Sequence, residues 1–212
     1  MKGILLTLIM LLSIQLFSQT DQKAKSILDQ VSNKTKSYAS ITASFDFIMA
    51  NKEVGLEESN KGSLIIQGEQ YKLSITGIEI LCDGKSQWTY MKDAAEVSIT
   101  DAGNDEEGML NPAKIFTIYE EGFNYIFLGE SISNKKKVFK IDLIPTEVKE
   151  FSRVILDIDK DLFQIVNATM FGTDGNQYTI KVNQMETTKS YPSSTFVFDD
   201  KKYPGINVID MR

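Results

Sequence analysis

The sequence contains no histidine and only one cysteine, Cys82, among its 212 residues. Histidine is the commonest general base and the commonest metal ligand in proteins, so its absence excludes Ser-His-Asp catalysis and leaves a zinc site poorly supplied with ligands. A thiol nucleophile would lack its usual imidazole partner. Because one cysteine cannot form an internal disulfide, stability has to come from packing, with Cys82 as a buried, inert thiol. These absences argue against an enzyme, and no cofactor is expected.

Basic side chains are also in the minority, with 23 lysines and arginines against 29 aspartates and glutamates. The resulting net charge of −6 argues against a protein that follows nucleic-acid phosphates. It argues equally against charge-driven binding to an anionic membrane surface. We interpret the one basic run, Lys135-Lys136-Lys137, as a solvated turn ahead of a strand.

One acidic group superficially resembles a metal site. Asp157, Asp159 and Asp161 have the spacing that opens a calcium-binding EF-hand loop. Such a loop needs glycine at its sixth position and glutamate at its twelfth, where this chain has Leu162 and Ala168. We therefore interpret the group as a turn between two strands, and no metal is expected.

Only the N-terminus carries a long hydrophobic run. Lys2 precedes an apolar stretch over residues 4–12, which is followed by a more polar segment up to Ser18. This layout predicts a secretory signal peptide over residues 1–18. A membrane anchor is the alternative, but the run is shorter than the roughly 20 residues that span a bilayer. Cleavage after Ser18 would leave one exported domain, residues 19–212, with 22 basic and 29 acidic side chains and a net charge of −7.

Two segments have helical patterns. Residues 21–36 place four apolar side chains at i, i+3, i+4 and i+7, which predicts an amphipathic helix with Thr20 as its N-cap. Its apolar stripe consists of Ala24, Ile27, Leu28 and Val31. The pair Asn111-Pro112 has the form of an N-cap followed by proline at the first helical position, so a second, shorter helix is predicted from there to Gly122.

Most of the remaining chain alternates apolar and polar residues with period two, which predicts strands. We expect about ten antiparallel strands, a mainly β fold with α-helical additions, and a curved sheet or barrel. The polar segment 100–108 is predicted to be a mobile loop. The strand signals lie over residues 41–50, 60–67, 71–76, 80–91 (a hairpin), 97–99, 127–133, 138–144, 151–158, 163–171, 178–185 and 195–198.

The hairpin over residues 80–91 is the most informative of these segments. Its Asp83-Gly84-Lys85 turn is typical of a tight connection, and the large rings of Trp88 and Tyr90 lie on one strand face beyond it. If such faces point inward across the sheet, an open barrel would enclose an apolar hollow suited to acyl chains. An ordinary sandwich core is the alternative, and the pattern alone does not decide between the two.

Several stretches, in order along the chain, resemble the LolA family of periplasmic carriers of outer-membrane lipoproteins. The likeness covers nearly all of residues 19–212, and it depends on the order and spacing of the motifs more than on any one of them. The stretches are "ITASFDF", "KGSLIIQGEQYKLSI", "ILCDGKSQWTYMKDAAEVSIT", "NPAKIF" and "TFVFDDKKYPGINVID".

The resemblance implies an incomplete, unclosed antiparallel β-barrel with an α-helical lid over an apolar cavity. It implies a monomeric chaperone-carrier that takes acylated lipoproteins from an inner-membrane ABC-type release complex to an outer-membrane acceptor or to the membrane itself. By position it assigns Tyr71, Leu73, Ile80, Trp88, Ile115 and Phe116 to the cavity or the lid contacts. With the strand pattern, the full set of expected ligand-binding residues is Phe45, Phe47, Leu64, Ile66, Tyr71, Leu73, Ile80, Trp88, Tyr90, Ile115, Phe116, Met170 and Tyr178.

One turn departs from the family. Its members often have a basic Lys-Arg-Pro turn after the Gly-x-Leu strand, and the arginine there helps to hold the lid closed. This chain has Gln67-Gly68-Glu69 instead, with Lys72 as the nearest cation. Lid control and the handover partner are therefore expected to differ. A carrier of another lipid or glycolipid, or a lipid-sensing domain, remains an alternative function.

Overall fold

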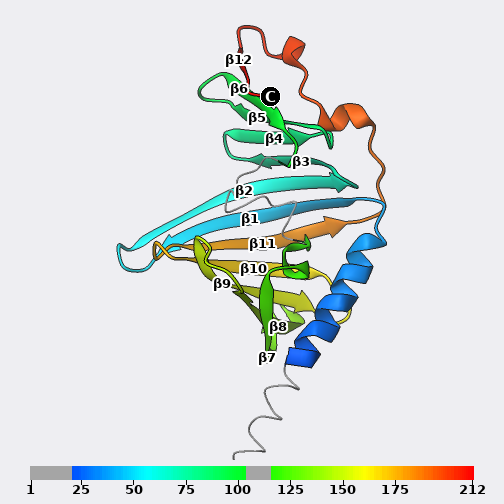
Figure 1. The fold of residues 1–212 in the computed structure, drawn as a ribbon, viewed down its shortest axis with the longest axis vertical. Coiled ribbons are helices and arrows are strands. Elements are labelled where there is room, and N and C mark those ends of the chain that lie inside the picture. Colours follow the sequence, from blue (N-terminus) through cyan, green and yellow to red (C-terminus); the bar gives the residue numbers. More distant parts are fainter. Residues whose placement is uncertain (1–20, 104–115) are drawn as a thin grey trace, which may run out of the picture.

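A computed structural model describes residues 21–103 and 116–212. The described strands form one twelve-stranded sheet in the order β12-β6-β5-β4-β3-β2-β1-β11-β10-β9-β8-β7, so the sheet is open, with β12 and β7 at its edges (Figure 1). The strands are β1 (Ile41–Asn51), β2 (Leu56–Gln67), β3 (Gln70–Ile75), β4 (Ile78–Cys82), β5 (Ser86–Met91), β6 (Glu96–Asp101), β7 (Phe123–Ser133), β8 (Lys136–Pro145), β9 (Phe151–Asp159), β10 (Ile165–Gly172), β11 (Gln177–Glu186) and β12 (Asn207–Asp210).

The mainly β fold is confirmed, with corrections to the number and kind of elements. The expected count of about ten strands is too low, and β2 begins four residues before the predicted start. The strand predicted over residues 195–198 is wrong, because a 3-10 helix, η3 (Ser193–Phe196), occupies this region and Phe196 is fully buried. The last strand, β12, was missed. It pairs with β6 in parallel through its backbone while its side chains stay exposed, so it shows no alternating burial.

The predicted first helix is present over residues 21–36. All four residues of its apolar stripe are at most 4% exposed, and they pack with inward side chains of β8, β9 and β10 such as Leu143 and Leu156. Figure 1 shows the helix beside the β7–β11 part of the sheet. In the described part of the chain, no helix combines the length and apolarity needed to cross a bilayer.

Other predictions fall wholly or partly outside the described residues. These are the N-cap Thr20, the signal segment 1–18, most of the loop 100–108, Ile115, and the first half of the helix predicted from Asn111. In the described half of that helix, the chain forms a short 3-10 turn, η2 (Ile118–Glu120). The neighbouring side chains of Phe116 and Tyr119 are buried in the same core as the first helix.

The strand register assigns each side chain to one of two faces. Leu64, Leu73 and Ile80 are directly opposite one another in β2, β3 and β4, so they share a face, which we call the inner face because the helix packs on it. Trp88 is opposite Leu81, and Tyr90 is opposite Glu79, so both rings lie on the other, outer face. The expectation that Trp88 and Tyr90 point to the same side as Leu73 and Ile80 is therefore wrong.

The C-terminal segment, residues 187–206, explains why the hairpin carries large rings. The ring of Tyr90 contacts those of Phe198 and Tyr203, at centroid distances of 5.5 and 4.8 Å. Phe198 and Tyr203 also stack on each other at 4.9 Å. Phe196 of the same segment is fully buried. The aromatic side of the hairpin therefore forms a second, smaller core on the outer face.

The outer face of the β7–β11 part is polar. Arg153 forms a two-pronged contact with Asp142, at 3.0 and 2.6 Å, and Lys140 contacts Asp157 at 2.6 Å. Asp159 accepts hydrogen bonds from the backbone N–H groups of Asp161 and Leu162, which confirms the predicted turn between β9 and β10. Burial alone would raise the pKa of Asp159, but these bonds and the one from Lys136 hold that pKa below its usual value.

Candidate functional site: the inner apolar face

Most of the residues predicted to bind a ligand do come together on the inner face. Two of them, Trp88 and Tyr90, lie on the outer face instead, and Ile115 is outside the described residues. Phe116 belongs to the core beneath the helix. The predicted residues that the sheet register places on the inner face are Phe45, Phe47, Leu64, Ile66, Tyr71, Leu73, Ile80, Met170 and Tyr178.

The inner face changes from closed to accessible along its width. Under the helix, Leu143 and Leu156 are fully buried. On β2–β5, Leu64, Leu73 and their buried neighbours alternate with partly exposed inner side chains, of which Ile78 and Met91 reach 45% and 37% exposure. We call the accessible residues the inner apolar strip; they are Ile66, Ile75, Ile78, Ile80 and Met91. A grouped apolar surface of this kind is unusual on a protein without a ligand or partner for it.

The packing on the inner face explains the glycine of the Gly-x-Leu strand, Gly62. The ring of Phe45 on β1 lies directly across Gly62 on β2, so a Cβ added at Gly62 would sit 2.3 Å from the ring. Glycine in a strand interior commonly marks such a close approach. Here it allows the ring of Phe45 to be buried against the backbone of β2.

Aromatic rings also line the inner face at its other end. The rings of Phe47 and Tyr178 stack with their centroids 6.3 Å apart. Both were predicted to bind a ligand, and they come from distant parts of the chain. Sequence reasoning missed Phe127 and Phe163, whose rings flank Phe139 at 6.1 and 6.2 Å. For Phe127 a signal was available, because it continues the period-two alternation at the start of β7.

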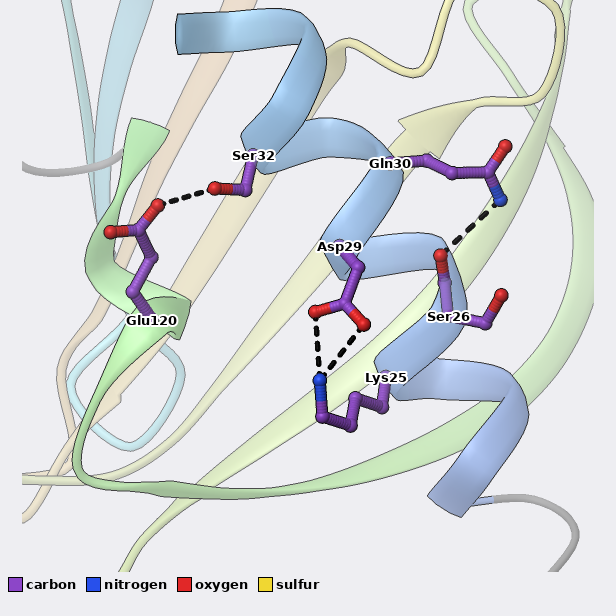
Figure 2. Close-up of polar contacts among 6 residues, drawn as sticks. All are labelled: Lys25, Ser26, Asp29, Gln30, Ser32 and Glu120. Carbon is purple, nitrogen blue, oxygen red and sulfur yellow. Dashed lines mark hydrogen bonds and ion pairs between the residues drawn. The ribbon is translucent and has the colours of Figure 1, made fainter.

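A polar contact fastens the helix to the segment ahead of β7. Glu120 accepts a hydrogen bond from the Ser32 hydroxyl at 2.6 Å (Figure 2) and forms an ion pair with Lys36 at 2.9 Å. The hydrogen bond from Ser32, and then that from Lys36, hold the pKa of the Glu120 carboxyl below its usual value. We call these three residues the Glu120 clasp. By contrast, Lys25 and Asp29 in Figure 2 pair within the helix.

The departure from the family's basic turn has a structural counterpart. The side-chain amide of Gln67 both donates to the backbone carbonyl of Tyr191 and accepts from its N–H, at 3.0 and 2.9 Å. This residue therefore holds the C-terminal segment. Lys72 lies on the outer face and pairs with Glu79 at 3.0 Å. Neither residue forms a hydrogen bond or ion pair with the described helix over residues 21–36, whereas Glu120 contacts both Ser32 and Lys36 of that helix.

The inner face is suited to apolar contact with a ligand more than to metal coordination or proton transfer. Within residues 21–103 and 116–212, no three histidine, cysteine, aspartate or glutamate side chains are grouped as a metal site would need. A hollow of about 380 Å³ lies beside β10 and β11, with Lys136, Gln164 and Lys181 among its lining. Its lining mixes polar side chains with apolar ones such as Ile165 and Val182, and it includes none of the predicted ligand-binding residues. The inner apolar strip is the better candidate for a binding surface.

Comparison with known proteins agrees with this fold. The family model described as outer membrane lipoprotein carrier protein LolA matches residues 14–175. The solved structure of an uncharacterized conserved protein from Thermus thermophilus is similar, with a TM-score of 0.60 at 12% identity, over 89% of this chain and 99% of that one. A domain described as an outer membrane lipoprotein-sorting protein, from Vibrio parahaemolyticus, has a TM-score of 0.50 at 11% identity, over 83% of this chain and 97% of that one.

A curated protein also matches, an uncharacterized protein of Methanocaldococcus jannaschii. It is 22% identical over 201 residues, which is 93% of this chain. The present chain spans only 58% of the length of that protein. At these identities the solved structures show a shared fold and not a shared cargo.

Proposed function

Because the chain belongs to the family of the outer membrane lipoprotein carrier protein LolA, we propose that it is a periplasmic carrier that binds the acyl chains of lipoproteins on its inner face. The observation that carries the proposal is the inner apolar strip, with Ile78 45% exposed beside a fully packed core. In this proposal the helix over residues 21–36 is the cover of the inner face, and residues 1–18 are the export signal.

The energetics of acyl burial suit such a surface. Each methylene removed from water contributes about 0.8 kcal/mol, so an acyl chain is retained without any specific polar contact. A carrier also has to release its cargo, which favours an adaptable lining of isoleucine and methionine side chains, such as Ile80 and Met91, over a rigid fit. The role proposed is binding and handover, without catalysis.

The proposed route runs from an inner-membrane ABC-type release complex to an acceptor at the outer membrane, or to that membrane directly. The net charge of −7 for residues 19–212 supports a protein that does not adhere to anionic lipid surfaces by charge during the crossing. A monomer fits this task, because the cargo itself covers the inner apolar strip.

The test is release of a tri-acylated lipoprotein from membrane vesicles into the soluble fraction by the purified protein. Wild type is expected to release it in about one-to-one complexes, and Ile80→Glu is expected to release at least about tenfold less, because a carboxylate on the inner face would have to be buried against a tail. Ile132→Glu adds the same charge at a 77% exposed position on the edge strand β7 and serves as the matched control. Equal release by the two variants would contradict the proposal.

A second candidate function keeps the fold and changes the cargo to another lipid or glycolipid. It is favoured by Gln67, which binds Tyr191 where the family often has a basic turn. Mass spectrometry of ligands that co-purify with the protein, with lipoprotein localisation after depletion, separates the two candidates. Correctly placed lipoproteins in depleted cells, together with a bound glycolipid, would select the second.

A further inference from the structure

Apart from Met91, the inner face changes from mainly apolar to polar residues between β4 and β5. On β1 to β4 its positions are mainly apolar, as in the cross-strand row Ala43, Leu64, Leu73 and Ile80. The same row continues into Thr89 of β5 and Ser98 of β6. The neighbouring row ends in Gln87 and Thr100. We call Gln87, Thr89, Ser98 and Thr100 the polar row.

A side-chain hydrogen bond connects the polar row to the apolar region of the inner face. The Tyr71 hydroxyl, on a side chain that is 8% exposed, donates a hydrogen bond to the side-chain oxygen of Gln87. Tyr71 and Gln87 lie on β3 and β5, two strand spacings or about 10 Å apart. Uncharged donors and acceptors therefore begin where the inner apolar strip ends, and both lie on one continuous face.

Cations are missing from this face in strands β1 to β6, all of which the structure describes. Lys72, the lysine nearest to the polar row in β3 and β4, pairs with Glu79 on the opposite side of the sheet. The acidic residues on this face of β1 to β6 are Glu58, directly opposite Met49, and Glu96, directly opposite Met91. A phosphate group bound among these strand residues would lose hydration without gaining a counter-charge from them, which is costly. The exposed Lys85 lies outside the strands, in the turn ahead of β5.

Resting on the proposed function, we propose that the polar row binds the uncharged head region of the acylated ligand while its tails lie along the inner apolar strip. The head chemistry it recognises is ester or amide carbonyls and neutral hydroxyls, as found in an acylated glyceryl-cysteine or a glycolipid. Threonine and serine hydroxyls and the Gln87 amide both donate and accept, so they match such groups. The face thereby selects against phospholipids, the most abundant competing amphiphiles of the envelope.

The test uses displacement of a neutral apolar dye from the full mature chain by four probes of equal acyl length. These are a dipalmitoyl-glyceryl-cysteinyl peptide made neutral by N-acetylation and C-terminal amidation, a dipalmitoyl glycolipid, dipalmitoyl phosphatidylglycerol and a C16 hydrocarbon without a head group. Wild type is expected to bind both neutral-headed probes at least about tenfold more tightly than phosphatidylglycerol. Which neutral probe binds better identifies the source of the head group.

The double variant Thr89→Val with Ser98→Ala removes two hydroxyls at nearly constant shape. It is expected to weaken binding of the neutral-headed probes by about three- to tenfold per lost hydrogen bond, and to leave the hydrocarbon unchanged. The matched control is Thr76→Val with Ser63→Ala. Thr76 is exposed at the turn after β3, and Ser63 is exposed on the outer face of β2. Each single variant is measured as well, in case the double variant does not fold.

The outcomes separate the two proposals. Acyl binding that ignores the head group, or that is unchanged in the double variant, overturns the polar-row proposal and leaves the carrier function standing. Failure of every acylated probe and of the hydrocarbon to displace the dye overturns the carrier function, and the head-group selection with it. Head-group preference that falls in the double variant and persists in the control supports both.

Discussion

The two ends of the sheet bury opposite faces. In the β7–β11 part, the helix over residues 21–36 covers the inner face, and the outer face carries ion pairs such as Arg153 with Asp142. In the β3–β6 part, the C-terminal segment covers the outer face, and the inner face stays partly open. Which face of the sheet is buried therefore depends on the segment that packs against it, the helix at one end and the C-terminal segment at the other, more than on the alternation within the strands. The partly open inner face at one end is the surface to which the proposed function assigns the ligand.

The largest expected effect comes from the helix-covered end. Leu156→Ala removes a fully buried side chain from a dense core and is expected to lower the free energy of unfolding by about 2–5 kcal/mol. Urea denaturation followed by far-UV circular dichroism measures this loss. Ile132→Ala, at a 77% exposed position on the edge strand, is the control and should change stability by less than about 0.5 kcal/mol. A small loss for Leu156→Ala would mean that this end is less tightly closed than the structure shows.

Much of this architecture follows from local pattern. The i, i+3, i+4, i+7 stripe of the first helix and the alternation of β1 predicted elements that the structure confirms. The face of Trp88 was not accessible in this way. Alternation shows that Trp88 and Tyr90 share a side, but only the pairing of β5 with β4 and the contact of the Tyr90 ring with Phe198 show which side it is. The short strand β12 was invisible for a related reason, since its backbone pairs while its side chains stay exposed.

An intermediate effect is expected at the C-terminal segment. Tyr203→Leu keeps an apolar side chain but loses the ring contacts with Tyr90 and Phe198, which should destabilise the docked segment by about 1 kcal/mol. If the two ends are as separate as their covers suggest, the loss is local. Limited proteolysis within residues 187–206 should become several-fold faster while the midpoint of global unfolding hardly moves. An equal shift of the global midpoint would show instead that the two ends unfold as one unit.

The smallest effect is expected at the Glu120 clasp, which joins the helix to the segment before β7. The pKa of the Glu120 carboxyl is lowered in the folded protein, so the clasp contributes stability above the ordinary carboxyl pKa and loses it as the pH falls through the folded pKa. Because the pair with Lys36 is largely exposed, the contribution at pH 7 should be below about 1 kcal/mol. Unfolding of wild type and Glu120→Gln is compared at pH 7 and at pH 3, and the difference should shrink at the lower pH. A difference that persists at pH 3 would mean that the clasp acts through the Ser32 hydrogen bond alone, and charge would then have no part in joining the helix to the segment before β7.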